Sequence, residues 1–352
     1  MGSGDGPAGY RVPPPEPDSF VDWPDGFGTR FTVFVDTEEE FDWRRPLSRD
    51  SRAVSAVRAI PAAHARFADR GAALTWLVDH PIATSPQAVA ILRRTLEDGR
   101  SAIGTQLHPW VNPPFDEQVS GPNSFTANLP KSLQAAKLAA LTAAIEQAFG
   151  ARPLAYRAGR YGIGPDSFAL LAAEGYRLDS SMRSAYDYSD EAGPDFAAIP
   201  NRAFRRGGIV ELPFTTVFTG RLRGGGIGRY RALARLPRGK GIAARLGLLS
   251  RVSLTPEDMP LADALEAVRV AVGEGLRVLN FAFHSPSLEP GHTPYVRDAA
   301  DLAAFHRWWD AVLALLDRLG VRNASLAELI AAADAACGTG APSAIAAPAG
   351  GL

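Results

Sequence analysis

Three side chains that can do acid–base or metal chemistry follow apolar runs that are typical of buried strands. Asp36 comes directly after FTVFV, His108 ends AIGTQLH, and His284 ends NFAFH. Carboxylates and imidazoles hold divalent metals, activate water and transfer protons. A carboxylate at the end of an apolar strand is costly unless a cation or a proton neutralises it. The pattern predicts a chemical site assembled from strand ends.

Strand periodicity selects further candidates beside these three. Successive side chains of a strand alternate between its faces, so Glu38 shares a side with Asp36, and Gln106 shares one with His108. Arg157 ends another strand candidate, and its planar guanidinium suits the orientation of a carboxylate. The remaining acidic residues of the first strand end are interpreted as a solvated loop: Glu39, Glu40 and Asp42.

The elements that position these residues alternate between strand and helix. Strands are predicted at 31–35, 72–78, 102–107, 154–157, 209–212, 277–283 and 321–323. Helix starts are predicted where Ser85 and Thr255 each precede a proline, and where Ser325 and Glu328 have capping-box spacing. Sustained alternation predicts an α/β fold with parallel strands, and a closed or nearly closed barrel fits it best. A doubly wound open sheet is the alternative, but no glycine-rich phosphate loop supports it.

Composition bounds the class of protein. The chain has 352 residues, 46% of them hydrophobic and 21% charged, with a net charge of −1 and one cysteine, Cys337. A single cysteine excludes an intrachain disulfide and a cysteine metal cluster. The start of the sequence has no pattern of a secretory signal, and no run approaches the ~20 apolar residues of a membrane span. We therefore expect a cytoplasmic protein without a nucleic-acid partner.

Domain organisation follows from the same pattern. Residues 1–28 are expected to form a flexible or surface-hugging lead-in, 29–336 the barrel, and 337–352 a disordered tail. A basic Gly/Arg-rich insertion is expected at about 220–252. Its segment 221–251 has nine Lys or Arg and no acidic residue. This insertion is either a solvated connection or a surface that contacts an anionic membrane or glycan.

Six motifs then resemble one family. They are VFVDTEEEFDW at 33–43, AIGTQLHPWVNPPF at 102–115, YRAGRYGIGPDSF at 156–168, GYRLDSSM at 175–182, VELPFTT at 210–216, and FAFHSPSLEPGHTPYVRD at 281–298. In order and spacing they resemble the polysaccharide deacetylase superfamily (NodB homology, carbohydrate esterase family 4), and its WalW-like branch most. The resemblance spans residues 30–335 and implies a deformed (β/α) barrel of about seven parallel strands.

The resemblance implies roles for the candidate residues. Asp36 is implied as the catalytic carboxylate, Arg157 as the arginine that orients it, and His284 as the general acid. His108 is implied as a ligand of a divalent cation, with zinc the expected ion. The family's usual second aspartate and second metal histidine are absent, so Asp36 or Glu38, with the amide of Asn112 or Gln106, would complete the metal site.

The implied reaction is hydrolysis of an N-acetyl group on an oligo- or polysaccharide. Substrate contacts are expected from aromatic and polar residues near the site: Trp43, Gln106, Trp110, Arg160 and Tyr161. Asp179 is the sequence candidate for a carboxylate beside His284. Two rival functions stay open, a glycosidase that uses Asp36 and Glu211, and a catalytically silent carbohydrate-binding barrel.

Overall fold

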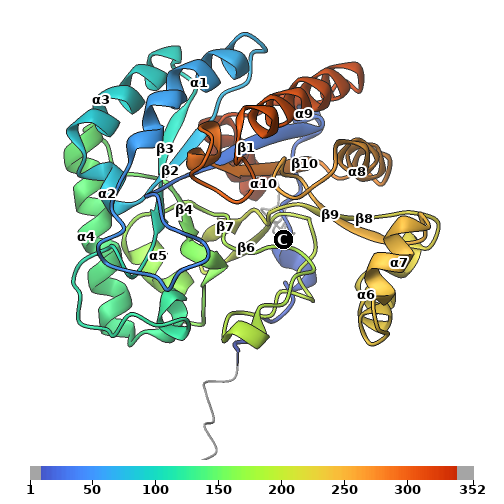
Figure 1. Ribbon diagram of the computed structural model, residues 1–352, viewed down its shortest axis with the longest axis horizontal. Coiled ribbons are helices and arrows are strands. Elements are labelled where there is room, and N and C mark those ends of the chain that lie inside the picture. The colour runs from blue at the N-terminus through green and yellow to red at the C-terminus, as the bar shows by residue number, and fades with distance from the viewer. Residues whose placement is uncertain (1–8, 339–352) are drawn as a thin grey trace, which may run out of the picture.

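The computed structural model describes residues 9–338, which form a curled, mostly parallel sheet with helices outside it (Figure 1). The strand order is β10-β1-β2-β3-β4-β5-β7-β6, with β11 pairing β1, and only β6 runs antiparallel to its neighbour. Within the described residues β6 and β10 are the two edges, so the barrel is open. The strands are β1 Arg30–Thr37, β2 Thr75–Val78, β3 Ala102–Leu107, β4 Ala155–Ala158, β5 Leu178–Asp179, β6 Phe204–Arg206, β7 Ile209–Glu211, β10 Val278–His284 and β11 Arg322–Asn323.

The predicted α/β deformed barrel is thus confirmed, and a strand exists at each of the predicted positions. The prediction missed β5 and β6, which have two and three residues. It also missed a separate antiparallel pair, β8 Thr216–Thr219 and β9 Ser250–Ser253. Such short strands carry too few residues to show a period of two.

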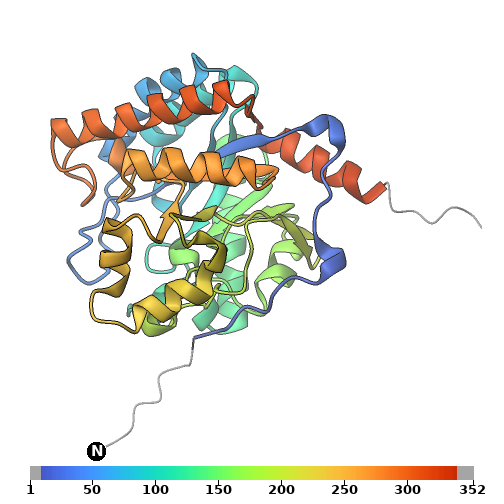
Figure 2. The same ribbon diagram turned by 90° about the vertical axis from the view of Figure 1, so that its right-hand side faces the viewer.

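Helices connect the strands, and most of them cover the outer face of the sheet. They are α1 Ile60–Ala68, α2 His80–Ala83, α3 Pro86–Thr95, α4 Lys131–Phe149, α5 Ser167–Ala173, α6 Gly226–Ala234, α7 Gly239–Arg245, α8 Leu261–Gly273, α9 Ala299–Arg318 and α10 Leu326–Gly338. Figure 2 shows α8 and α9 lying side by side. No helix among residues 9–338 combines the length and the apolar character that a bilayer span requires.

Two of the three predicted helix starts are confirmed. The Ser85 hydroxyl accepts a hydrogen bond from the Ala88 amide at 3.3 Å, and Ser325 and Glu328 form a reciprocal capping box. The third prediction is wrong. Thr255 lies in a loop, and α8 begins only at Leu261.

The alternation of β1 decides which side chains enter the barrel. Val33 and Val35 belong to the core between the sheet and the helices, whereas Phe34 belongs to a second core inside the curl. Asp36 follows Phe34 by two residues and therefore points to the inside, at the carboxyl end of the strand. The sequence FTVFVD thus places one carboxylate at the mouth of an otherwise apolar interior.

The lead-in lies against the barrel where the structure describes it, at residues 9–28. Val12, Val21 and Trp23 are buried, and the Val12 amide donates to the Asp195 carbonyl at 3.0 Å. Val21 and Trp23 cover the inner core near α10, whereas Val12 packs with the outer core. Residues 1–8 and all but the first two residues of the predicted tail lie outside the described part of the chain; those two residues, 337 and 338, end α10.

The basic insertion forms α6 and α7 at the tip of the β8–β9 pair (Figure 1). Part of its charge is neutralised internally, since Arg231 pairs with Asp187 at 2.8 Å and Arg223 with Glu274 at 3.5 Å. Contact of this insertion with an anionic surface stays a prediction.

Candidate active site

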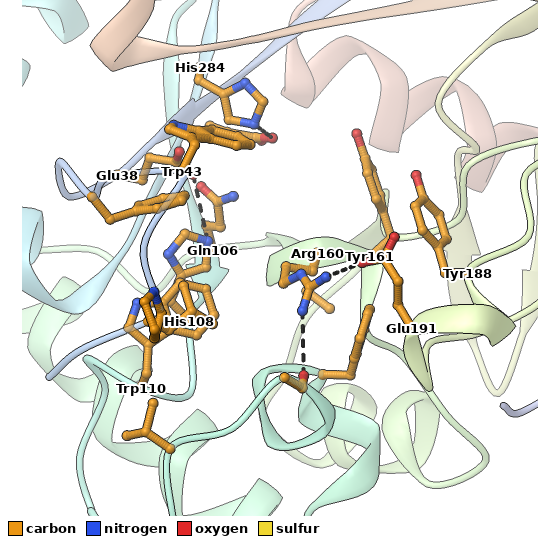
Figure 3. Close-up of a pocket in the computed structure, with 18 of the residues that line it drawn as sticks. Glu38, Trp43, Gln106, His108, Trp110, Arg160, Tyr161, Tyr188, Glu191 and His284 are labelled. Atoms are coloured by element: carbon orange, nitrogen blue, oxygen red, sulfur yellow. Dashed lines mark hydrogen bonds and ion pairs between the residues drawn. The ribbon is translucent and has the colours of Figure 1, made fainter. Parts of the chain in front are cut away.

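A cavity of about 660 Å³ opens at the carboxyl ends of the central strands. Figure 3 shows its two walls, one with Glu38, Trp43, Gln106, His108, Trp110 and His284, the other with Arg160, Tyr161, Tyr188 and Glu191. The cavity brings together the predicted site residues except Asn112, Asp179 and Glu211. Residues from the ends of β1, β3, β4 and β10 therefore meet at one place, as parallel topology requires.

Asp36 is held in the floor of this cavity by Arg157. The Arg157 Nη1 donates to Asp36 Oδ1 at 2.6 Å, and both side chains are almost fully buried. Two further donors of the same guanidinium bind Ser180, Nε to the carbonyl at 3.0 Å and Nη2 to the hydroxyl at 3.1 Å. The arginine is thereby fixed on one side and presents a single N–H to the carboxylate, which orients Asp36 with Oδ2 free.

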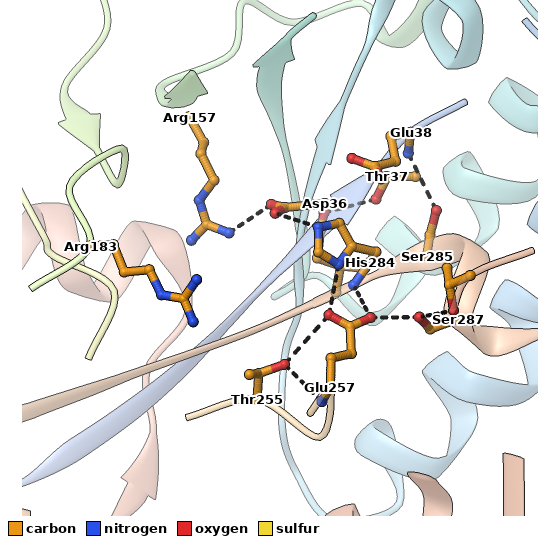
Figure 4. A network of polar contacts seen from close by, with 12 residues as sticks. Asp36, Thr37, Glu38, Arg157, Arg183, Thr255, Glu257, His284, Ser285 and Ser287 are labelled. Carbon is orange, nitrogen blue, oxygen red and sulfur yellow. Dashed lines mark hydrogen bonds and ion pairs between the residues drawn. The ribbon is translucent and has the colours of Figure 1, made fainter. Parts of the chain in front are cut away.

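His284 stands opposite that free oxygen. The strands β1 and β10 pair with Asp36 and His284 in register, and His284 Nε2 lies 3.8 Å from Asp36 Oδ2. On its other side Nδ1 lies 2.7 Å from Glu257 Oε2 (Figure 4). Burial alone lowers the pKa of His284, but the charges of Glu257, Glu38 and Asp36 outweigh it and raise the pKa to about 10. A protonated imidazole therefore faces a carboxylate across the cavity floor.

The partner of His284 is not the predicted Asp179. Asp179 is buried in register with Glu211, and its Oδ1 accepts from the Ser181 hydroxyl at 2.5 Å. Glu257 comes instead from the loop between β9 and α8, where Thr255 and the proline after it predicted a helix start. No local pattern marks Glu257, because its role depends on a contact with a distant strand.

A second group of side chains, whose atoms could ligate a metal, lies beside Asp36 and His284. It consists of Glu38, His108 and Gln106. Glu38 Oε2 is 3.6 Å from His108 Nε2, and no hydrogen-bond donor among residues 9–338 reaches the Glu38 carboxylate. Burial raises the pKa of Glu38 to about 8, although the positive charges of His284 and His108 oppose the shift. Gln106 Oε1 is also buried without a hydrogen-bond partner. Gln106 Oε1 thus lacks a partner in the interior, and Glu38 Oε2 and His108 Nε2 face each other beyond hydrogen-bond distance. Two oxygens and one nitrogen of this kind fit a bound divalent cation.

His108 is prepared for this role by the residues behind it. Its Nδ1 lies 2.8 Å from Glu39 Oε2, while Glu39 Oε1 accepts from Trp110 Nε1 at 2.8 Å. A carboxylate bound to one imidazole nitrogen fixes the tautomer and leaves the lone pair on the other nitrogen. The Glu39 amide in turn donates to Asp79 Oδ2 at 2.7 Å. The expectation that Glu39 is a solvated loop residue is therefore wrong, since it is fully buried behind His108.

Glu39, Asp79 and His108 are themselves close enough to hold a cation, with one ligand atom of each within 4.8 Å of the others. Their atoms are already committed, however. Asp79 Oδ1 accepts from the Ile82 amide at 2.8 Å, and both Glu39 oxygens are engaged as described. These contacts support the His108 ring from its Nδ1 side and leave its Nε2 facing Glu38.

Asn112 does not face the cavity. Its amide Nδ2 donates to the carbonyls of Pro113 and Lys137, each at 2.8 Å. Lys137 on α4 is fully buried, and its Nζ donates to the carbonyls of Pro109, Asn112 and Pro114 at 2.6–2.9 Å and pairs with Glu117 at 3.0 Å. The loop at 109–117 is folded around this ammonium, which turns Asn112 away from His108.

The loop after β4 brings the opposite wall close. Arg160 and Tyr161 both have left-handed backbones, with φ of 53° and 60°. Such a conformation costs a side-chain-bearing residue about 1 kcal/mol or more, and it is typical of functional loops. Arg160 is fixed by Ser124 and Glu191. A Cβ at Gly159 would lie 2.3 Å from His108 Cδ2, so only glycine lets this loop approach the histidine.

The aromatic candidates differ in what they can contact. Trp110 is 2% exposed and stacks on His108 with ring centroids 4.3 Å apart, so it supports the imidazole. Trp43 is 38% exposed and lies edge-on to His284 and Tyr295, at centroid distances of 5.4 and 5.6 Å. Trp43 therefore offers the accessible apolar face at the cavity mouth.

Comparison with known proteins identifies the fold. A candidate polysaccharide deacetylase from Mycobacterium smegmatis superposes with a TM-score of 0.54 at 17% identity, covering 95% of this chain and 99% of that chain. A candidate glycoside hydrolase/deacetylase from Parabacteroides distasonis superposes with a TM-score of 0.53 at 12% identity, covering 88% and 70%. Neither family models nor curated protein sequences match the chain. The chain therefore has the (β/α) barrel fold of polysaccharide deacetylase-type proteins.

Proposed function

We propose that the protein is a metal-dependent hydrolase that removes N-acetyl groups from a glycan containing amino sugars. One observation carries the proposal: Asp36 Oδ2 and His284 Nε2 face each other at 3.8 Å, each fixed from behind by an ionic partner, Arg157 or Glu257. A base and an acid on one cavity floor are what hydrolysis of an unreactive amide needs. The fold of deacetylase-type proteins supports the same reaction class.

The residues divide the proton transfers between them. Asp36 Oδ2 accepts a proton from the attacking water, whose oxygen bonds to the acetyl carbon. His284 Nε2 donates its proton to the sugar nitrogen as the C–N bond breaks, so the products are acetate and a free amine. With a pKa of about 10, His284 is protonated at neutral pH and can act as this donor. Arg157 keeps Asp36 turned toward the water.

A divalent cation, with zinc as the expected ion, would be held by Glu38, His108 Nε2 and Gln106 Oε1. When bound, it polarises the acetyl carbonyl and lowers the pKa of water. This assignment gives Asp36 the role of base rather than ligand, and it omits Asn112 because that amide binds backbone carbonyls elsewhere.

The rival functions fit the site less well. Glu211, the second carboxylate of a glycosidase, is fully buried, accepts from the Met182 amide at 3.1 Å and does not line the cavity. A catalytically silent carbohydrate-binding barrel would not require a protonated His284 opposite Asp36.

The test is acetate release from a panel of N-acetylated oligosaccharides, with and without added divalent metal. Asp36→Asn and His284→Ala should each lower turnover by ~10²-fold or more, whereas His306→Ala on α9 should not. Metal content and folding of His284→Ala should match the parent protein. Shortened chains without acetate would identify a glycosidase, and sugar binding without turnover in the metal-loaded parent would identify a silent barrel.

A further inference from the structure

A side chamber of about 230 Å³ adjoins the main cavity behind the catalytic pair. The two spaces share five wall residues: Asp36, Tyr161, Arg183, His284 and Tyr295. A group bound in the chamber would therefore belong to the same substrate whose acetyl group lies between Asp36 and His284.

Arg183 lines both spaces and carries a charge that no carboxylate neutralises. Its Nη1 donates to the Tyr188 hydroxyl at 3.1 Å, and its Nη2 donates to the hydroxyls of Tyr186 at 3.1 Å and Ser253 at 2.8 Å. Within residues 9–338 no carboxylate oxygen lies within 4.0 Å of it, and its Nε is buried without an acceptor. The other cavity arginines differ, since Arg157 pairs with Asp36 and Arg160 with Glu191.

A second unneutralised guanidinium lies behind Arg183. Arg183 and Arg251 stack on Tyr186, with their guanidinium carbons 3.7 and 3.5 Å from its ring centroid. Arg251 donates to the Ala185 carbonyl at 3.0 Å and, in the described part of the chain, has no carboxylate within 4.0 Å. Burial raises the pKa of Tyr186, but the two arginine charges outweigh it and lower the pKa. The potential at this end of the chamber is therefore positive.

The Tyr186 hydroxyl completes a set of hydrogen-bond donors. It accepts from Arg183 Nη2 and from the Ser253 hydroxyl, both at 3.1 Å. With its lone pairs occupied, its own O–H is left to donate toward the chamber that Tyr186 lines.

The acidic residues of the chamber wall do not compensate this charge. Asp36 is held by Arg157, and Glu257 by His284 and by Ser287 at 2.5 Å. Asp258 is exposed, and its carboxylate lies beyond 4.0 Å from Arg183. A partly buried guanidinium without an anion is costly, so a ligand oxyanion would stabilise it.

We infer that the side chamber is an oxyanion subsite, in which Arg183 and the Tyr186 hydroxyl bind a carboxylate or phosphate group of the substrate. The inference rests on the proposed function and names its substrate class, an acidic glycan with N-acetylated amino sugars. Recognition of the anion positions the neighbouring acetamide against Asp36 and His284.

The experiment measures binding of three matched sugars to the full chain by calorimetry, with acetate assayed in the same samples. The sugars are N-acetylglucosamine, its 3-O-lactyl derivative, which adds a carboxylate, and its 6-phosphate. At least one anionic sugar should bind about tenfold or more tightly than the neutral one, since hydrogen bonds to charged groups are stronger than those between neutral groups. The anionic sugar that binds more tightly shows whether the subsite prefers a carboxylate or a phosphate group.

Variants locate the effect. Arg183→Gln should abolish the preference for the anionic sugar, because it weakens binding of that sugar more than binding of the neutral one, and Tyr186→Phe should reduce the preference severalfold. Arg45→Gln is the matched control, because Arg45 also lines the main cavity but pairs with Asp42 at 3.3 Å. Added salt should weaken binding of the anionic sugar only.

Three outcomes would overturn the subsite: no preference in the parent protein, a preference that survives Arg183→Gln, or equal loss of neutral and anionic sugars. The salt dependence of the parent protein decides the matter if Arg183→Gln does not fold. Anion preference without any acetate release would refute the proposed hydrolysis and leave the subsite standing.

Discussion

The carboxylate of Glu257 holds His284 by its ring and by its backbone. Oε2 lies 2.7 Å from Nδ1, and Oε1 accepts from the His284 amide at 3.1 Å. Both contacts come from one side chain, so the backbone amide fixes the carboxylate that in turn holds the imidazole. Glu257 therefore sets the direction of Nε2 and, through its charge, the pKa of the ring.

Replacing Glu257 by glutamine should change the pH dependence of the reaction. His284 must be protonated to act, so activity falls as pH rises through its pKa, which is about 10 in the folded protein. Without the Glu257 charge, this alkaline limb should move down toward the ordinary histidine value of about 6.5. Turnover at pH 8 should fall by ~10-fold or more. The profile of kcat/KM against pH measures the shift.

Asp258→Asn is the control for that experiment. It removes the neighbouring negative charge, and asparagine tolerates the positive φ of 60° at this position. Its alkaline limb should stay near that of the parent protein. An unmoved limb in Glu257→Gln would show that His284 is not the proton donor.

The proposed metal site predicts that loss of the Gln106 amide lowers metal occupancy, whereas loss of the Asn112 amide does not. His108→Ala and Gln106→Ala should lower metal occupancy, because each removes an atom that faces Glu38 or lacks another partner. Asn112→Ala should retain the metal although it loses two hydrogen bonds to backbone carbonyls. Elemental analysis of the purified variants measures occupancy. Full occupancy in His108→Ala would place the metal elsewhere.

Glu38 should make the metal-free protein less stable as pH rises. Its pKa is about 8 in the folded protein and near 4.5 when unfolded, so the folded state binds more protons between these values. The free energy of unfolding therefore falls with increasing pH across this window. Glu38→Gln should flatten that fall and be the more stable protein at pH 8. Urea unfolding at several pH values, with chelator present, tests this; parallel curves for both proteins would contradict it.

Lys137→Met should destabilise the fold by about 3–5 kcal/mol, the scale for breaking a buried ion pair. The substitution leaves Glu117 and three loop carbonyls without their donor. Lys131→Met, which breaks an exposed pair with Asp166, should cost less than about 1 kcal/mol. Urea unfolding, with the dependence of the unfolding free energy on urea concentration held the same, compares the two variants. Equal losses of stability would show that Lys137 has no special structural role.

The sequence predicts the parts of the site that lie on strands. FTVFV places Asp36 by alternation alone, and NFAFH does the same for His284, because a period of two and parallel topology leave little freedom. Glu257 escapes prediction because Thr255-Pro256 has the chemistry of a helix start, while the actual loop is fixed by contacts to His284 and Ser287. Local patterns do not register such distant contacts.

Two further differences have the same origin. Glu39 belongs to a polar run, yet it is buried because Trp110 and His108 supply donors from another strand end. Asn112 stands four residues after His108, yet its side chain follows a loop that an α4 lysine organises. In both cases a partner remote in sequence overrides the local pattern.

The ammonium of Lys137 does for the loop at 109–117 what a coordinated potassium or calcium ion does in other proteins, but it is tethered to α4 and never exchanges with the medium. The shape of this loop, and with it the seat of Trp110 beneath His108, is therefore independent of ion concentration and of chelators. This wall of the cavity is therefore organised by the chain's own ammonium group and not by a bound ion.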